Sequence, residues 1–386
     1  MINGTRDEYL AAIKDRYRTA GRRYKKLILN EFCDAWSCHR KHAIRLLKAT
    51  PPQVHRQRGA RPKYNADVVR ILEYIWLATN KLCSKLLKAA LPTWMPHYRK
   101  DHRVRPEVAE KVLKISPATI DRLLKPTRRI HGSRGHCGTR PGTWLKNQVP
   151  IKTDHSDVDR PGFLHADTVA HCGDSLEGNF VWTLTLTDVF SGWTENRAVW
   201  NKGYEGVIQA IQDIENELPF FILCFHSDNG GEFLNHHLNR YLSKRNRPIP
   251  VTRGRPSHKN DNPYAEQKNW HRVRQILGYQ RIEDSSLIQP INLLFRSCAL
   301  YSNFFCPTQK LLKKIKVGSR YTRTYEPIPQ TPYQRLMDSP HLFEPQKTHL
   351  TEVFCNLNPF SLKKLIDHCP RALNFPTKVH LKIPTH

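Results

Sequence analysis

The stretch FFILCFHSDNGGEFLN, residues 220–235, combines an apolar run with an aspartate and two glycines. The run is apolar enough to form a strand that is buried on both faces, which is typical of a strand covered by helices. Asp228 ends that strand, and a carboxylate in such a place is costly unless a partner compensates its charge. Gly230 and Gly231 allow another backbone or a phosphate to come close. The stretch therefore predicts a buried strand that carries a carboxylate to a functional site.

Strand-like and helix-like segments alternate around this strand. Three strand-like runs precede it, and helical patterns separate it from a short later run. Three consecutive strands followed by alternating helix and strand predict a mixed five-stranded sheet that helices cover, in an α/β domain at residues 160–284. The expected strands are 162–170, 179–190, 193–200, 220–228 and 248–254, and the expected helices are 204–218, 234–246 and 262–278.

The charge of the chain is strongly positive. Among 386 residues, 62 Lys and Arg stand against 34 Asp and Glu, which gives a net charge of +28. A polyanion fits such a surface, because neutralising many phosphates requires many cations; a merely soluble basic protein is the alternative. Sixteen of the 34 acidic residues lie between Asp154 and Glu266. A DNA-binding chain that gathers carboxylates in one domain is expected to hold cations there.

Two helix–turn–helix patterns precede the sheet domain. In the first, apolar periodicity runs to Trp36, breaks at Ser37 and resumes on a basic helix. In the second, Ser116 and Pro117 are residue types that begin a helix after a short turn. We expect DNA-binding domains at 1–62 and 63–126, with ordinary helical hairpins as the alternative. The expected DNA contacts on these helices are Arg40, Lys41, Arg45, Arg122 and Lys125.

The segments on either side of the sheet domain are basic. Residues 127–159 are rich in Gly, Pro and Arg, so they predict a linker that follows a nucleic-acid backbone. Residues 285–386 predict a basic, mostly helical C-terminal region, in which no acidic residue occurs before Glu326. The expected DNA contacts on the linker are Arg128, Arg129, Arg134 and Arg140.

The cysteines and the chain start indicate the compartment. Ten cysteines are scattered singly without a Cys-x-x-Cys pair, which predicts reduced thiols. The Cys and His residues at 33–42 match no common zinc spacing. The start has no signal-peptide pattern, and no stretch approaches a membrane span. We therefore expect a cytoplasmic, nucleoid-associated protein without a membrane partner.

Three carboxylates are expected to meet at one edge of the sheet. Asp167 lies within a strand and Asp228 ends another, so the two would emerge together if those strands are neighbours. Glu266 shares a helical stripe with Trp270 and Leu277, which predicts that it faces the sheet. Three converging carboxylates repel one another unless divalent cations neutralise them. Their hard oxygen atoms suit two Mg²⁺ ions ~3.5–4 Å apart, which clamp the attacking and leaving oxygens of a phosphoryl transfer.

Two other acidic residues are candidates for the same role. Asp188 precedes a turn, which it is expected to order. Asp261 is close to Glu266 in the sequence, but its loop position disfavours it as a metal ligand.

The order LHADT at 164–168, HSDNGGEF at 226–233 and NPYAEQKN at 262–269 carries a resemblance. It resembles the DDE catalytic core of retroviral-type integrases and bacterial insertion-sequence transposases, and it covers roughly residues 160–280. The resemblance implies a ribonuclease H-like fold and an enzyme that cuts DNA at the ends of a mobile element and joins the 3′ ends to target DNA. It makes Asp167, Asp228 and Glu266 the ligands of two Mg²⁺ ions, for which Mn²⁺ is expected to substitute.

The resemblance also implies partners and further contacts. Because two ends must be joined, the enzyme is expected to act as a homo-oligomer, a dimer or a tetramer, on double-stranded DNA from the terminal repeats and the target. The amino-terminal His-His-Cys-Cys module of retroviral integrases is not found in the sequence, which favours a bacterial mobile element. The expected DNA contacts near the site are His258, Lys259, Lys268 and Asn269, with solvated polar residues as the alternative.

Two other classes of function stay open. One is a domesticated DNA-binding regulator that keeps the fold without the chemistry, which the complete Asp, Asp, Glu set disfavours. The other is a nuclease of the same fold that cuts without joining, which the helix–turn–helix pair and the basic linker disfavour but do not exclude.

Overall fold

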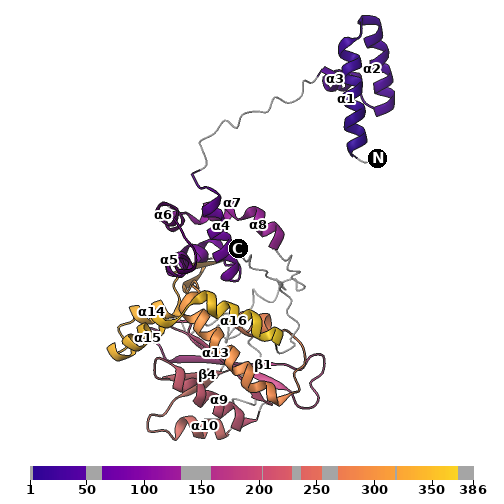
Figure 1. Cartoon of the computed structure of the whole chain (residues 1–386). Helices are drawn as coiled ribbons and strands as arrows, with labels where there is room; N and C mark the ends of the chain where they lie inside the picture. The colour runs from indigo at the N-terminus through magenta and orange to yellow at the C-terminus, as the bar shows by residue number, and fades with distance from the viewer. Residues whose placement is uncertain are drawn as a thin grey trace. The chain divides into compact units, whose positions relative to one another are not determined.

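The computed structural model describes residues 3–48, 63–131, 158–201, 203–227, 236–253, 268–317 and 320–372. The chain divides into two compact units, Met1–Lys63 and Tyr64–His386. Figure 1 shows their elements in order along the chain. None of the helices in these described ranges is long and apolar enough to cross a membrane.

The first unit consists of three helices around a small core. Ser37 adopts a left-handed φ of 47° after the second helix, which ends that helix and turns the chain towards the third. Phe32 on one side of the turn and Ala43 on the other are fully buried in the shared core. The predicted shape of helix, turn and helix is confirmed. The helices are α1 (Asn3–Thr19), α2 (Arg22–Trp36) and α3 (Arg40–Lys48).

The second unit begins with five helices, α4 (Ala66–Ala78), α5 (Ser84–Asp101), α6 (Pro106–Lys114), α7 (Pro117–Leu123) and α8 (Lys125–His131). Ser116 caps α7 by accepting a hydrogen bond from the Thr119 backbone N–H, as its residue type predicts. The linker predicted from residue 127 begins too early, because 127–131 belong to α8. There the buried Thr127 donates a hydrogen bond from its hydroxyl to Glu73.

The centre of the second unit is a mixed five-stranded sheet, as the alternating pattern predicts. Its order is β3-β2-β1-β4-β5. β2 runs antiparallel to both β1 and β3, whereas β4 runs parallel to β1 and to β5. Helices α9 (Tyr204–Glu217) and α10 (His236–Ser243) lie between the later strands in the sequence. The strands are β1 (Phe163–Ala170), β2 (Val181–Asp188), β3 (Thr194–Trp200), β4 (Cys224–Ser227) and β5 (Val251–Arg253).

Helix α13 (Ile288–Phe305), which follows the short turn η3 (Ser285–Leu287), covers the outer edge of β3. The side-chain amide of Asn292 pairs with both backbone groups of Ala198, at 2.6 Å and 3.2 Å. The amide of Asn303 does the same with Thr194, at 3.1 Å in both directions. An uncovered edge strand is a template for pairing with another chain, so these two asparagines satisfy the edge within the protein.

The helices of residues 64–131 share one hydrophobic core with the sheet. The Trp94 indole N–H donates to the Phe305 carbonyl at 2.9 Å, and the Tyr301 hydroxyl donates to the Ala78 carbonyl at 2.6 Å. Trp94 and Phe305 are fully buried. The second helix–turn–helix segment, expected as a separate domain at 63–126, is therefore built into the same unit as the sheet through α13.

The residues after the sheet form a short π-helix, η2 (Trp270–Arg274), followed by α12 (Gln275–Leu277). A π-helix bonds residues five apart, so each residue advances less around the axis than in an α-helix. Val273 and Leu277 are buried, but Trp270 is 49% exposed. The α-helical stripe predicted to include Trp270 is wrong, and Asn269 takes the buried position instead.

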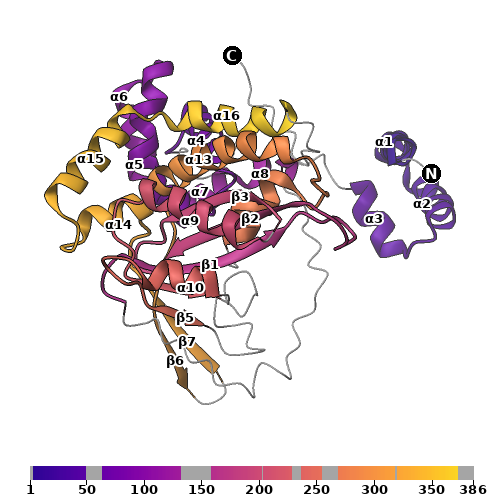
Figure 2. The same ribbon diagram turned by 90° about the horizontal axis from the view of Figure 1, so that it is seen from below.

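The C-terminal part is mostly helical, as predicted, with one addition. Strands β6 (Leu311–Val317) and β7 (Arg320–Tyr325) form a two-stranded antiparallel ribbon. The ribbon is a sheet separate from the five-stranded one, and Figure 2 labels its two strands. It was not expected, because its strands mix basic, polar and apolar residues and lack the continuous apolar run of a core strand. The helices that follow are α14 (Pro332–Asp338), α15 (Glu344–Asn356) and α16 (Pro359–Ala372).

Candidate active site

Asp167 lies in the second half of β1, the central strand of the sheet. It pairs with Thr185 of β2 in the antiparallel register. The Thr168 backbone N–H donates to its Oδ1 at 2.9 Å, and the Asn269 side chain donates from Nδ2 to its Oδ2 at 2.6 Å. The side chain is half-buried. The protein therefore holds this carboxylate in one orientation at a place that water or a ligand can reach.

A chain of buried polar side chains leads to Asp167 from the edge of the sheet. The amide of Asn196 on β3 donates to Thr185 Oγ1 at 2.8 Å, and the Thr185 hydroxyl donates to Asn269 Oδ1 at 2.6 Å. All three residues are buried. Because an ionised carboxylate only accepts hydrogen bonds, Asn269 must present Nδ2 to Asp167 and its oxygen to Thr185. The donor direction along the chain follows from that one requirement.

The end of β4 lies beside the same part of β1. Ser227, the last described residue of β4, pairs with Ala166 in the parallel register. The condition on which the meeting of the two aspartates depends, that β1 and β4 are neighbouring strands, is therefore met. Asp228 and Glu266, the other two predicted metal ligands, lie outside the described residues, as does Asp261. Among the residues that the structure describes, no cluster of three His, Cys, Asp or Glu side chains could hold a metal ion.

The predicted DNA contacts near the site fall into two pairs. His258 and Lys259 lie outside the described residues. Asn269 is only 8% exposed, and its amide is used by Asp167 and Thr185, so its geometry assigns it to holding the carboxylate rather than to DNA. Burial, together with the neighbouring charges of Arg272 and others, lowers the pKa of Lys268 to about 7.

Asp188 has the structural role that its place before a turn predicts. Its Oδ2 accepts hydrogen bonds from the Ser191 backbone N–H at 2.7 Å and from the Ser191 hydroxyl at 2.6 Å. Its Oδ1 accepts from the Gly162 N–H at 2.9 Å, which ties the turn to the start of β1. Burial raises the pKa of Asp188, while the hydrogen bonds from Ser191 and Gly162 oppose that shift.

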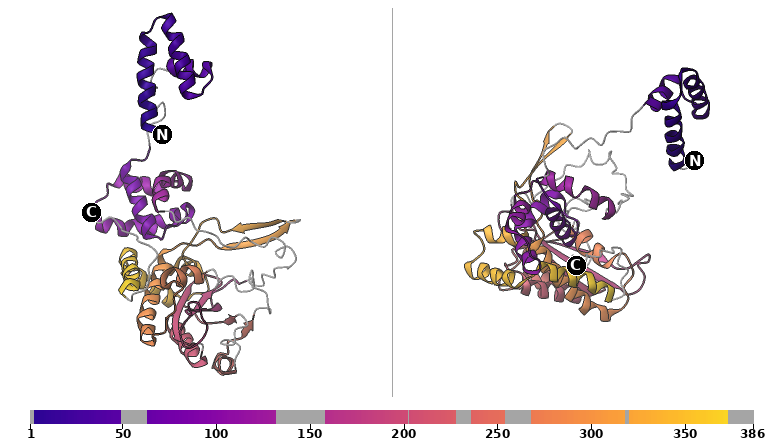
Figure 3. Two further views of the ribbon diagram at one scale, coloured as in Figure 1. Left: turned by 90° about the vertical axis from the view of Figure 1, so that its right-hand side faces the viewer. Right: turned by 45° about the horizontal axis from the view of Figure 1, so that its top comes forward.

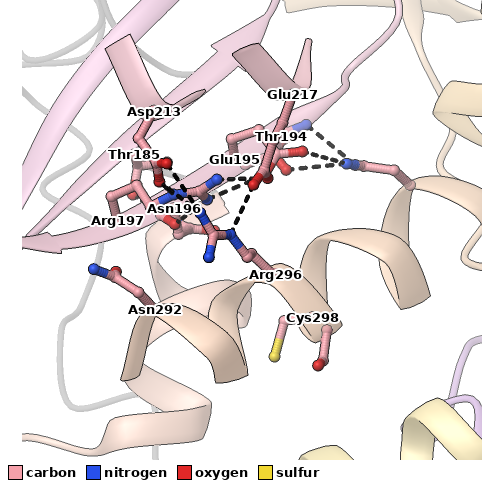
Figure 4. A network of polar contacts seen from close by, with 12 residues as sticks. Thr185, Thr194, Glu195, Asn196, Arg197, Asp213, Glu217, Asn292, Arg296 and Cys298 are labelled. Atoms are coloured by element: carbon pink, nitrogen blue, oxygen red, sulfur yellow. Dashed lines mark hydrogen bonds and ion pairs between the residues drawn. The ribbon is translucent and has the colours of Figure 1, made fainter. Parts of the chain in front are cut away.

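A charged network lies beside the polar chain, on β3, α9 and α13. Arg197 is buried and donates to Asp213 at 2.5 Å and to Glu217 at 2.5 Å (Figure 4). Arg296 binds the same two carboxylates, at 2.9 Å and 2.7 Å. Two guanidinium groups thus face three carboxylates, and the third, Glu195, is the most buried. Burial, with the nearby Glu217 adding to it, raises the pKa of Glu195 to about 7, although Arg197 opposes the shift.

Several predicted DNA contacts belong to the described helices. In the first unit Arg40, Lys41 and Arg45 are exposed on α3, where Arg40 also donates to Asn30 of α2. In the second unit Arg122 and Lys125 are exposed. Arg129 is exposed on α8, and Arg128 pairs with Asp121 and lies over the Trp76 ring. Arg134 and Arg140 lie outside the described residues. DNA binding by all of these residues stays a prediction.

The sequence did not identify Thr185 and Asn196 as part of the site. A signal was present, because Thr183, Thr185 and Thr187 alternate with leucines and so mark one face of β2 as polar. The sequence pattern does not show that Asp167 shares this face. The strand register shows it, because Asp167 pairs with Thr185 and Thr185 pairs with Asn196.

Comparison with known proteins gives one clear relative. No family model matches the chain. The uncharacterized protein y4rM of Sinorhizobium fredii is 35% identical over 329 residues, which cover 84% of this chain and 93% of that protein. The catalytic core domain of BIV integrase has a TM-score of 0.29 and 17% identity, over 47% of this chain and 96% of the core domain. The magnesium-bound catalytic core domain of HTLV-2 integrase has a TM-score of 0.29 and 15% identity, over 38% and 90%.

Proposed function

The chain belongs to the family of the y4rM protein of Sinorhizobium fredii, and we propose that it is a metal-dependent DNA transposase. In this proposal it binds the ends of a mobile DNA element, cuts them and joins them to target DNA. Because y4rM is itself uncharacterized, the proposal rests on the residues of this chain.

One observation carries the proposal: the oriented carboxylate of Asp167 lies on β1, next to the strand end that leads to Asp228. Ala166 and Ser227 are register partners on adjacent parallel strands, and each directly precedes one of the two aspartates in the sequence. The sheet order, with three antiparallel strands followed by two parallel ones, fits the ribonuclease H-like fold that the sequence motifs imply.

The donor set fits magnesium. Asp167, Asp228 and Glu266 offer only carboxylate oxygens, which are the hard ligands that Mg²⁺ prefers over the His and Cys ligands of zinc sites. Two bound Mg²⁺ ions would lower the barrier to phosphoryl transfer by stabilising charge on the attacking and leaving oxygens. The part of the protein in this step is positional: Asn269 fixes one oxygen of Asp167, and Thr185 and Asn196 fix Asn269.

The basic helices supply DNA binding in this proposal. Arg40, Lys41 and Arg45 are exposed on α3 of the first unit, and in this proposal they contact phosphates or base edges of an element end. Since two ends have to be brought together, we expect a homo-oligomer to be the active form.

Catalysis is tested with a pre-cleaved element end, a supercoiled plasmid and Mg²⁺. The wild type should give joined product, whereas Asp167→Asn, Asp228→Asn and Glu266→Gln should each abolish it while leaving end binding nearly unchanged. Asp174→Asn is the matched control, because Asp174 is an exposed carboxylate after β1 and outside the proposed site. If the three variants lost end binding together with joining, the catalytic assignment would be overturned.

The same assay separates the alternatives. Metal-dependent nicks without joined product would identify a nuclease. Specific binding of a correct end without any metal-dependent product would identify a regulator. Replacing Arg40, Lys41 and Arg45 together by glutamine in the full chain should abolish preference for the element end. If that preference survived, the role proposed for α3 would be wrong.

A further inference from the structure

The β6–β7 ribbon is rich in basic residues, and no step of the proposed reaction uses it. Between residues 311 and 325 the chain has five basic residues and no acidic residue. Among the described residues these two strands form a sheet of their own, and the ribbon projects from the body of the second unit in both views of Figure 3. The basic residues are Lys313, Lys314, Lys316, Arg320 and Arg323.

The register of the ribbon brings like charges together. Lys314 is the direct cross-strand partner of Arg323, and Lys316 is the partner of Tyr321. Because positions two apart on a strand share a face, these four positions lie on one face of the ribbon. Like charges directly opposite each other destabilise a strand pair by roughly 0.2–1 kcal/mol. A ribbon that keeps this arrangement gains stability when a polyanion covers that face.

The base of the ribbon is fixed to the sheet. The Lys310 backbone N–H donates to Glu326 Oε1 at 2.8 Å, and the Glu326 N–H donates to the Lys310 carbonyl at 3.0 Å. The Lys310 amine donates to the Phe190 carbonyl at 2.8 Å. Arg335 binds Glu326 and donates to the Ser191 carbonyl at 2.9 Å. The ribbon therefore stands on the turn between β2 and β3, the same turn that Asp188 orders.

We propose that the β6–β7 ribbon is an arm that binds the phosphate backbone of duplex DNA, with the face of Lys314, Lys316 and Arg323 towards the DNA. A two-stranded ribbon has the dimensions to enter the major groove, and the exposed Tyr325, which shares the face of Arg323 on β7, supplies apolar contact area. This inference rests on the proposed function, because it assigns DNA as the partner. The other reading of these lysines is protection of the ribbon edges against pairing with another chain.

The test measures DNA binding by the full chain in EDTA, so that it does not depend on catalysis. The variant Lys314→Gln/Arg323→Gln removes two charges and keeps long polar side chains. If both contact phosphates, the slope of log K against log salt should become shallower by about 2. The change should be the same on an element end and on an unrelated duplex, because phosphates carry no sequence. The control is Lys100→Gln/Lys364→Gln, which removes two exposed charges from α5 and α16 and should leave the slope unchanged.

The outcomes separate the ribbon from the proposed function. If the wild type has a steep slope and the ribbon variant matches it, the arm is refuted while DNA binding stands. If the wild type itself shows no salt-dependent DNA binding, the proposed function fails as well. A variant that self-associates in size-exclusion chromatography but keeps the wild-type slope would establish edge protection instead. Lys316→Gln alone, which leaves the opposed pair intact, should reduce the slope by about 1, and an unchanged slope would also refute the arm.

Discussion

Replacing Asn269 by alanine removes the link between Asp167 and the rest of the polar chain. The lost hydrogen bond to the carboxylate, 2.6 Å long, contributes about 1.5–3 kcal/mol, as hydrogen bonds to charged groups do. The lost bond from the buried Thr185 hydroxyl, also 2.6 Å, contributes about 0.5–1.5 kcal/mol. We therefore expect the free energy of unfolding to fall by about 2–4.5 kcal/mol. The unit Tyr64–His386 has an unfolding entropy of about 0.7 kcal/mol/K, so its Tm should fall by about 3–7 °C.

The functional consequence of Asn269→Ala is distinct from this loss of stability. If Asn269 positions a metal ligand, the variant should need more Mg²⁺ for half-maximal strand transfer, and high Mg²⁺ should partly restore the rate. Thr187→Val is the matched control. Thr187 is buried on the same face of β2 and bonds Thr194 rather than Asp167. Loss of the hydrogen bond between Thr187 and Thr194 should lower the Tm without changing the Mg²⁺ requirement of strand transfer.

The assays are thermal unfolding and a Mg²⁺ titration of strand transfer at a temperature at which all variants are folded. A variant whose activity fell only in proportion to its folded fraction, at an unchanged Mg²⁺ requirement, would refute the positioning role of Asn269. Asn269→Asp sharpens the test, because it replaces the donor with a second carboxylate facing Asp167. Repulsion between the two should reduce activity further than alanine does if the contact is as described.

Three further predictions concern stability. The pKa of Glu195 is raised to about 7 in the folded protein, so the folded state holds its proton more tightly than the unfolded state does. Its contribution to the free energy of unfolding is fully present below about pH 4.3 and is lost as the pH rises through 7. The wild type should lose about 3–4 kcal/mol relative to Glu195→Gln across that range, and parallel pH curves in denaturant titrations would contradict this. Asn303→Ala leaves both backbone groups of Thr194 without their partner at the sheet edge, so we expect a loss of about 2–4 kcal/mol and more self-association in light scattering. Ser116→Ala removes the cap of α7 and should cost about 1 kcal/mol in the same titrations; an unchanged midpoint would show that the cap contributes nothing.

The sequence by itself determined those features that depend on nearby residues. The strands of the five-stranded sheet were predictable because each lies in a local apolar run, and the capping by Ser116 depends on residues within one turn. The same holds for Asp188, which orders a turn only three residues long. Asp167 was also identifiable, since an acid within an apolar strand is rare without a function.

Tertiary structure alone decided which distant residues share an environment. Asn269 and Asp167 are 102 positions apart, and no local pattern shows that their side chains meet. The π-helical turn after Asn269 changed which side of that segment is buried, which a 3.6-residue period cannot anticipate. Packing of α13 against both the sheet edge and α5 joined a helical segment, expected to be separate, to the sheet. The physical reason is common to these cases: periodicity records that a face is covered, whereas the identity of the covering element depends on contacts across the whole chain.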